Sequence, residues 1–188
     1  MRRLIVQEFV TLDGLAAGPG GSVDFVPATA EGDAGVAENQ MRFIDTVDTI
    51  VLGRATYELF AGYWPNATGD DKAFADKVNA VPKLVFSSTL DRAPWGSWED
   101  ATISRDDPRE EIRRRREQDG KDMVVWGSLS LVRALAEAGV VDEYQLWLLP
   151  VVLGGGTPLF SDGSSSTMKL LDAKTTDGGA VLLRYEPS

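Results

Sequence analysis

The stretch Asp122–Leu135, DMVVWGSLSLVRAL, decides the fold. It opens with Met123–Trp126, a continuous apolar run containing two valines, which is typical of a strand buried on both faces. Gly127 ends this run, and Ser128 then occupies the position of a helix N-cap. Apolar residues follow at helical spacing, namely Leu129, Val132, Leu135 and Ala136. The sequence therefore predicts a buried strand that enters a helix through a Gly-Ser turn.

Such a turn places unbonded backbone N–H groups and the positive end of a helix dipole at the carboxyl end of a strand, which suits a phosphate. An ordinary turn without a ligand has the same pattern, so this turn alone leaves both interpretations open. Two similar junctions occur earlier in the chain. Asp48–Leu52 is a buried strand that turns into a helix through Gly53–Thr56, and the strand Lys83–Phe86 ends in the hydroxyl run Ser87–Thr89.

Together the three junctions predict a Gly-Arg, a Ser-Ser and a Gly-Ser pair at one edge of a sheet. Open α/β sheets bind ligands at the carboxyl ends of their strands. Two helix N-termini suit a pyrophosphate, while Arg54 with the hydroxyls of Ser87 and Ser88 suits a further phosphate monoester. NADP carries both groups in one molecule, so these residues would suit it.

The remaining elements predict an α/β fold with a mixed, mostly parallel central sheet and helices on both faces. Leu4–Leu12 is the first strand, a helix capped by Asp33 extends to Thr46, and Val140–Leu149 is a long strand. The segments 167–176 and 180–186 form a closing antiparallel hairpin. We find no linker that would divide the chain, and we expect a single domain over residues 1–188.

Two glycine-containing segments are candidates for contact with a substrate. Asp13-Gly14 ends the first strand and leads into 16–21, which we interpret as a flexible loop able to cover a ligand. Gly154-Gly155-Gly156 would let the backbone pass close to a flat ligand or to a neighbouring chain.

Composition excludes several kinds of chemistry. The chain has no cysteine and no histidine, so disulfides, thiolate nucleophiles, Ser-His-Asp triads and zinc-finger sites are impossible. We expect no metal site. The net charge of −10 disfavours nucleic acid. The one basic run, Arg113–Arg116, follows Glu110 and Glu111 at helical spacing, and we interpret it as a solvated helix face.

The sequence also gives no sign of a membrane segment. No apolar run approaches the roughly 20 residues of a transmembrane helix. The first strand, LIVQEFV, begins too early for a signal peptide to precede it. We therefore expect a cytoplasmic protein with no membrane partner.

Several short motifs resemble the dihydrofolate reductase fold, and more closely the C-terminal reductase domain of the bifunctional riboflavin-biosynthesis deaminase-reductase. The resemblance covers nearly the whole chain. The motifs that carry it are Thr11-Leu12-Asp13-Gly14, Val51-Leu52-Gly53-Arg54-Ala55-Thr56-Tyr57-Glu58, Val85-Phe86-Ser87-Ser88, Val125-Trp126-Gly127-Ser128 and Pro150-Val151-Val152-Leu153-Gly154-Gly155-Gly156.

This resemblance implies an NADPH-dependent reductase that transfers hydride to a small pyrimidine-like, pterin-like or ribosylamino substrate. Its model reaction is the reduction of 5-amino-6-(5-phosphoribosylamino)uracil. The resemblance assigns cofactor binding to Gly53, Arg54, Thr56, Ser87, Ser88, Gly127, Ser128, Leu129 and Ser130. We place the substrate beside Asp13, Gly14, Gly154, Gly155 and Gly156. The family also implies a homodimer, with Pro150–Phe160 and the preceding strand as contact residues.

Departures from the family pattern keep other functions open. Dihydrofolate reductases hold the pterin ring with an acidic residue on the first helix, and that position falls on Ala37 here. Glu38 turns away from the apolar face, and Asp33 can cap the helix. A serine at 128 also replaces the second glycine of a family pair. The alternatives are a nucleotide- or antifolate-binding protein without chemistry, a dihydrofolate reductase, or an assembly partner with a vestigial site. No residue identifies itself as the proton donor.

Overall fold

The computed structural model describes all of residues 1–188, which divide into two units. The first unit comprises Met1–Leu4 and Gln40–Val140, and the second comprises Ile5–Asn39 and Val141–Ser188. The chain passes between the units within β1 (Leu4–Thr11), within α2 (Ala34–Ile44) and after Val140. None of the helices combines the length and the apolar character that crossing a bilayer requires.

Four parallel strands form the sheet of the first unit. Their order is β5 (Thr102–Ser104), β4 (Lys83–Phe86), β3 (Val47–Gly53) and β6 (Asp122–Trp126). The apolar runs at the centres of β3 and β6 are almost completely shielded from solvent on both faces, as the sequence predicts for strands covered on two sides.

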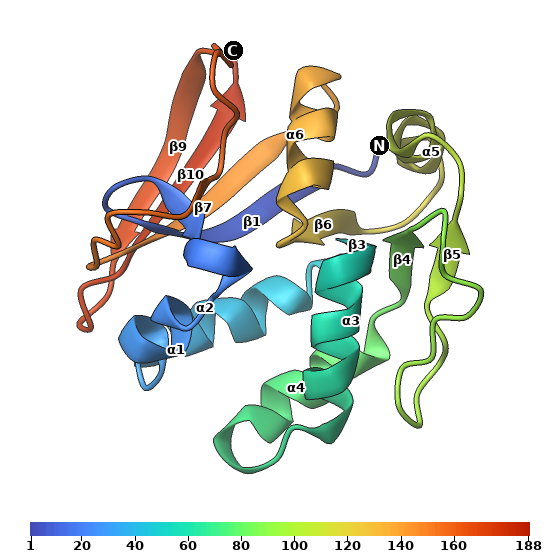
Figure 1. Ribbon diagram of the computed structural model, residues 1–188, viewed down its shortest axis with the longest axis horizontal. Helices are drawn as coiled ribbons and strands as arrows, with labels where there is room; N and C mark the ends of the chain where they lie inside the picture. The colour runs from blue at the N-terminus through green and yellow to red at the C-terminus, as the bar shows by residue number, and fades with distance from the viewer. The chain divides into compact units, whose positions relative to one another are not determined.

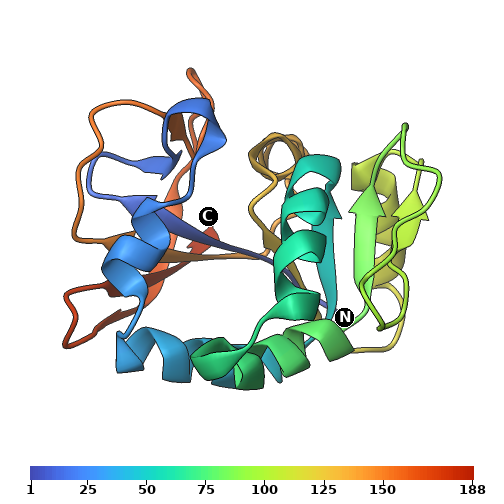
Figure 2. The same cartoon turned by 60° about the horizontal axis from the view of Figure 1, so that its bottom comes forward.

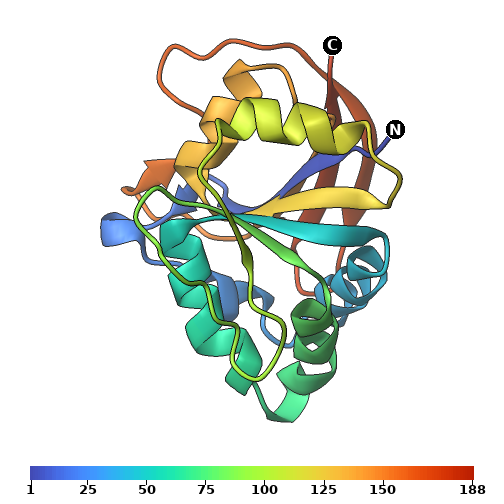
Figure 3. The same ribbon diagram turned by 90° about the vertical axis from the view of Figure 1, so that its right-hand side faces the viewer.

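Helices cover both faces of this sheet. In Figure 3, α3 (Arg54–Tyr63) and α4 (Lys72–Ala80) lie below the strands, while α5 (Pro108–Arg116) and α6 (Leu129–Glu137) lie above them. Figure 2 shows α3 alongside β3 and β4. Two short 3₁₀ turns, Trp64–Asn66 and Gly69–Asp71, connect α3 to α4.

The basic run of α5 lies on a charged helix face, as expected. Its ion pairs include residues three apart as well as residues four apart. Glu110 pairs with Arg113 at 2.5 Å, three residues away, rather than with Arg114. Glu111 is buried and accepts from both Arg114 and Arg115. Residues three and four apart are both neighbours on a helix, so spacing alone does not choose between them.

The second unit places β1 beside three further strands in the order β1, β7 (Glu143–Leu149), β10 (Val181–Pro187) and β9 (Met168–Thr175). β1 and β7 are parallel, whereas β10 is antiparallel to both β7 and β9 (Figure 1). The predicted C-terminal hairpin is therefore confirmed. The predicted strand from Val140 begins instead at Glu143, because the Val140 N–H donates to the Leu135 carbonyl and so completes the end of α6.

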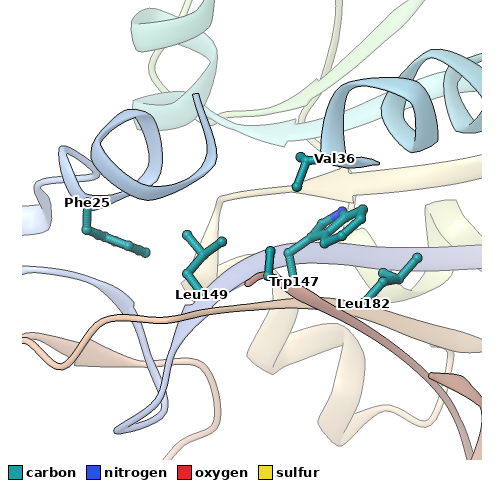
Figure 4. Close-up of a cluster of buried hydrophobic side chains, with 6 residues drawn as sticks. Phe25, Val36, Trp147, Leu149 and Leu182 are labelled. Atoms are coloured by element: carbon teal, nitrogen blue, oxygen red, sulfur yellow. The ribbon is translucent and has the colours of Figure 1, made fainter. Parts of the chain in front are cut away.

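A cluster of apolar side chains holds α1 (Phe25–Ala30) and the start of α2 against the strands of the second unit. Figure 4 shows Phe25, Val36, Trp147, Leu149 and Leu182 converging, with Ala180 completing the buried set. Phe9 stacks on Trp147 with ring centroids 6.4 Å apart. Burial of this kind contributes about 1.5–3 kcal/mol for each large apolar side chain.

The segment predicted as a flexible loop is instead folded. Ala16 and Ala17 are buried in β2 (Leu15–Ala17), which pairs with β8 (Thr157–Pro158), and Pro19–Gly21 forms a 3₁₀ turn. A Cβ on Gly156 would lie 2.2 Å from the Ala17 carbonyl oxygen. The glycine run thus allows the close backbone approach that its sequence predicts, and the approach is to this chain's own backbone.

Candidate functional site

In the first unit, three strands end level with one another where the predicted cofactor residues lie. Gly53 at the end of β3 is in register with Phe86, which directly precedes Ser87, and Val51 is in register with Val125. Parallel strands in this register bring positions 53, 87 and 127 to the same carboxyl edge. The structure therefore brings the Gly-Arg, Ser-Ser and Gly-Ser pairs together as the sequence predicts.

The two strand-to-helix turns at this edge are hydrogen-bonded to each other. The Gly53 N–H donates to Ser128 Oγ at 2.7 Å, and the Ser128 N–H donates to Thr56 Oγ1 at 2.9 Å. α3 begins at Arg54 and α6 at Leu129, so the first amides of both helices lie next to this contact. The first amides of a helix have no partner within the helix, and they are donors suited to an anion.

Ser128 occupies the N-cap position of α6, as predicted, but its side chain does not cap the helix. Its backbone is left-handed, with φ of 56° and ψ of 44°, and its hydroxyl makes no capping hydrogen bond to the helix. The hydroxyl accepts from Gly53 instead. Gly127 is also left-handed, and a Cβ there would lie 2.9 Å from Thr56 Cγ2, so this position needs glycine.

The cationic and hydroxyl side chains at this edge differ in the hydrogen bonds and ion pairs that they form within the protein. Arg54 is exposed, and its only ion pair is a 3.4 Å contact with the equally exposed Glu58. Ser87 Oγ accepts from the N–H groups of Thr89 and Leu90, so it stabilises its own turn, whereas Ser88 is exposed. Leu129 is half-buried and Ser130 is exposed at the start of α6.

In the second unit, the two predicted substrate segments are joined through a single carboxylate. Asp13 accepts hydrogen bonds from the N–H groups of Leu153 at 3.3 Å and Gly154 at 2.8 Å, and from the Thr11 hydroxyl at 2.5 Å. The Thr11 hydroxyl, followed by the Gly154 N–H, lowers the pKa of Asp13 below its usual value. Asp13 therefore stays ionised and holds the two segments together.

The glycines of these segments leave open backbone. A Cβ on Gly14, Gly154 or Gly155 would meet no atom within 4 Å, and Gly14 and Gly154 have φ of 78° and 71°. Gly156 is different because Ala17 lies against it. Thr11 belongs to a family motif but was not predicted as a site residue; its hydroxyl donates to Asp13 and accepts from the Leu15 N–H. Its place two residues before an aspartate is a local signal that could have identified it.

The first long helix offers no carboxylate to the apolar cluster of the second unit. Asp33 caps α2 by accepting from the N–H groups of Gly35 and Val36, and its other oxygen accepts from the Thr176 hydroxyl. Ala37 and Glu38 are exposed. Val36 is the α2 residue that contributes to the cluster. No group of three or more carboxylate side chains is arranged to hold a metal ion.

Solved structures share this fold at low sequence identity. A protein from Shewanella sp. PV-4 named for riboflavin biosynthesis is 20% identical, with a TM-score of 0.75 over 99% of both chains. The deaminase/5-amino-6-(5-phosphoribosylamino)uracil reductase of Thermotoga maritima is 15% identical, with a TM-score of 0.66 over all of this chain and 57% of that one. Dihydrofolate reductase from Enterococcus faecalis, solved with NADP(H), is 14% identical, with a TM-score of 0.60 over 99% and 96% of the chains. The predicted dihydrofolate reductase-like fold is thereby confirmed.

Sequence comparisons establish the family. The protein YyaP of Bacillus subtilis is 33% identical over 187 residues, which cover 98% of this chain and 94% of YyaP. The family model of the RibD C-terminal domain matches residues 2–182 and so includes most of both units. The chain therefore belongs to the family of the RibD C-terminal domain.

Proposed function

We propose that this protein is an NADPH-dependent reductase of a small pyrimidine-like, pterin-like or ribosylamino substrate. The observation that carries the proposal is the pair of mutually hydrogen-bonded turns at the carboxyl ends of β3 and β6. Ligands of open α/β sheets bind at this edge. The family match over residues 2–182 supports the proposal and also supports treating the chain as one functional domain.

The residues at this edge fit the phosphates of NADPH. The first amides of α3 and α6 suit the pyrophosphate, because both helices begin beside the same contact. Arg54 is exposed and weakly paired, so its guanidinium is available for the 2′-phosphate together with the Ser88 hydroxyl. NADPH, when bound, supplies the hydride.

The protein's own contribution to the reaction is positioning. Asp13 fixes the turn at Gly154, and the open backbone at Gly14, Gly154 and Gly155 gives a flat substrate a surface to approach closely. Asp13 cannot supply a proton near neutral pH, because its pKa is lowered. We assign the proton to solvent water.

Dihydrofolate fits the second unit poorly. Folate enzymes recognise the pterin through a carboxylate on the first helix, and in this chain Asp33 is engaged in capping while Glu38 is exposed. We therefore favour a substrate of the ribosylaminopyrimidine class, as in the reductase from Thermotoga maritima.

The proposal is tested by titrating the protein with NADPH and with NADH. Binding is detected through the quenching of tryptophan fluorescence and through the fluorescence of the cofactor. We expect saturable binding of NADPH and weaker binding of NADH. The absence of saturable binding, or equal affinity for the two cofactors, would refute it. NADPH oxidation across a panel of pterins, pyrimidines and ribosylamino compounds then identifies the substrate class.

A second candidate function is a binding protein that retains the site without chemistry. The observation that favours it is the engagement of Asp13, which leaves the turns at 13–14 and 154–156 without an available acid. This candidate predicts NADPH binding with no oxidation by any compound of the panel, whereas the reductase predicts turnover with at least one.

We also propose a homodimer, with contacts from 150–160 and the strand β7 that precedes them. Val152 and Phe160 in this segment are large apolar side chains that are 65% and 40% exposed. Sedimentation velocity at several protein concentrations measures the assembly state. A monomer throughout would overturn this part of the proposal without affecting the cofactor site.

A further inference from the structure

Ser128 adopts a backbone conformation that disfavours its side chain. It is the only residue other than glycine in the chain with a positive φ, and it directly follows the left-handed Gly127. Glycine would adopt this conformation at lower cost, so a serine at this position needs a compensating contact. That contact is the 2.7 Å hydrogen bond that Ser128 Oγ accepts from the Gly53 N–H.

A second hydrogen bond in the opposite sense closes the contact between the turns. The Ser128 N–H donates to Thr56 Oγ1 at 2.9 Å, and Thr56 belongs to the first turn of α3. The Thr56 methyl group also lies where a side chain on Gly127 would have to be. We call this arrangement of Gly53, Thr56, Gly127 and Ser128 the turn clasp. It fixes the start of α3 to the start of α6.

The clasp determines which groups remain for a ligand. The Gly53 N–H and the Ser128 N–H are used within the protein. The first amides of α3 and α6 beyond the clasp stay available, and the clasp fixes their relative positions. A pyrophosphate that spans two helix ends depends on that relative position, because misplaced donors lose much of their interaction energy.

We infer that Ser128 is a positioning residue: its hydroxyl holds the α3 turn against the α6 turn and thereby sets the geometry in which both helix ends bind the pyrophosphate of NADPH. This inference rests on the proposed function. It differs from a direct ligand contact because Ser128 acts through Gly53 and Thr56.

Ser128→Gly is the decisive variant, since glycine adopts φ of 56° without strain and lacks the side chain that carries the hydroxyl. We expect its dissociation constants for NADPH and for NADH to rise by the same factor, about five- to tenfold, because both cofactors carry the pyrophosphate. The ratio of the two dissociation constants should stay unchanged. The midpoint of thermal unfolding should not fall, so the loss of affinity does not reflect a loss of stability. Ser166→Gly, in an exposed loop, is the matched control and should bind both cofactors as the wild type does.

Thr56 provides an independent test of the same clasp. Thr56→Val removes the acceptor of the Ser128 N–H and should weaken binding by a similar factor, whereas Thr56→Ser retains the acceptor and should restore wild-type affinity. The effects of Ser128→Gly and Thr56→Val on affinity should also be non-additive, because the clasp is lost once either hydroxyl is removed. Their combination should therefore weaken binding by much less than the product of the single effects.

The outcomes separate the inference from the proposed function. If the wild type fails to bind NADPH saturably, the proposed function is wrong. If the wild type binds and Ser128→Gly binds equally well, the positioning role is wrong. The inference is also wrong if the dissociation constant of the double variant, Ser128→Gly with Thr56→Val, rises by the product of the two single effects. The two hydroxyls would then act as independent ligand contacts.

Discussion

The two ends of the parallel strands in the first unit use their polar groups in opposite ways. At the amino ends of β3 and β6, Arg2 is buried and forms an ion pair with Asp48. It also donates to the Lys121 carbonyl at 2.8 Å and to Thr49 Oγ1 at 2.9 Å. A side chain on Gly120 would collide with this group, because its Cβ would lie 2.6 Å from Asp48 Oδ2.

The carboxyl ends of the same strands are built differently. There the clasp uses two backbone amides, Arg54 is exposed with one weak pairing, and Ser88 is exposed. The comparison indicates that polar side chains pair with one another at one end of the sheet, while at the other end exposed donors remain, as the proposed cofactor site requires. Substitutions of the paired side chains at the first end should therefore change the free energy of unfolding, and substitutions of the exposed side chains at the second should change affinity.

The largest effect is expected at the amino end. Asp48→Ala leaves the buried guanidinium of Arg2 without its ion pair, and we expect the free energy of unfolding to fall by about 3 kcal/mol. Urea denaturation measures this change, and NADPH affinity of the folded variant should stay the same. Lys72→Ala breaks an exposed pair with Asp76 and should change stability by less than about 1 kcal/mol. Equal losses in both variants would contradict the proposed difference between buried and exposed pairs.

Two glycines at the carboxyl end sharpen the comparison. Gly127→Ala introduces a Cβ at positive φ and against Thr56, and we expect a loss of about 2 kcal/mol in stability. Gly53 has an ordinary φ of −84°, and its Cβ would lie 3.5 Å from Ser128, so Gly53→Ala should lose less than about 1 kcal/mol. The prediction fails if Gly53→Ala is the less stable variant in thermal unfolding.

Lys83, at the amino end of β4, should make the stability of the protein depend on pH. Burial lowers the pKa of Lys83 from 10.5 to about 7, against the opposing effect of Glu99, and its Nζ donates to the Asn79 carbonyl and lies 4.4 Å from the centre of the Trp95 ring. A cavity of about 30 Å³ beside it is lined by Glu99 and Asp100.

Below pH 7 both the folded and the unfolded chain carry the Lys83 proton, and folding bears the full cost of burying the charge. Between pH 7 and 10.5 the folded chain loses this proton first, so stability should rise with pH. Relative to Lys83→Met, which lacks the titration, the wild type should gain about 1–2 kcal/mol between pH 7 and pH 9. Urea denaturation of both proteins at matched pH values measures the difference, and a parallel pH dependence would contradict it.

The smallest effect on stability is expected at Arg54. Its pair with Glu58 is exposed, so Arg54→Ala should change the free energy of unfolding by less than about 0.5 kcal/mol. Its NADPH dissociation constant should rise about tenfold while that for NADH stays constant, because only NADPH carries the 2′-phosphate. Fluorescence titration with both cofactors checks this, and an equal loss for NADPH and NADH would assign Arg54 to the pyrophosphate.

Patterns within short segments predicted most of the fold. The apolar runs of β3, β4 and β6 have the composition of doubly covered strands, and the pair Gly178-Gly179 marks the hairpin turn. α1 was missed because its six residues include a proline and follow a glycine-rich segment, so no helical period is visible. β2 was missed because three residues are too few to show alternation.

The candidate site was predicted in its position but not in its hydrogen bonds. Gly53, Ser87 and Gly127 each stand where an apolar strand ends, and the carboxyl ends of parallel strands lie at the same edge of a sheet. Their common edge could therefore be predicted from the sequence. The hydroxyl of Ser128 was expected to cap its own helix and instead binds a residue 75 positions earlier. Asp13 likewise binds Gly154, 141 positions later. Local pattern cannot predict bonds between residues so far apart in the chain.

The position of Trp147 has a practical consequence for every unfolding experiment on this protein. It is the only one of the five tryptophans in the second unit, since Trp64, Trp95, Trp98 and Trp126 all lie in the first. Its indole N–H is buried among apolar side chains without an acceptor, which should give it a blue-shifted emission. The difference in fluorescence between the wild type and Trp147→Phe therefore reports on the surroundings of this one residue in the second unit without any added label.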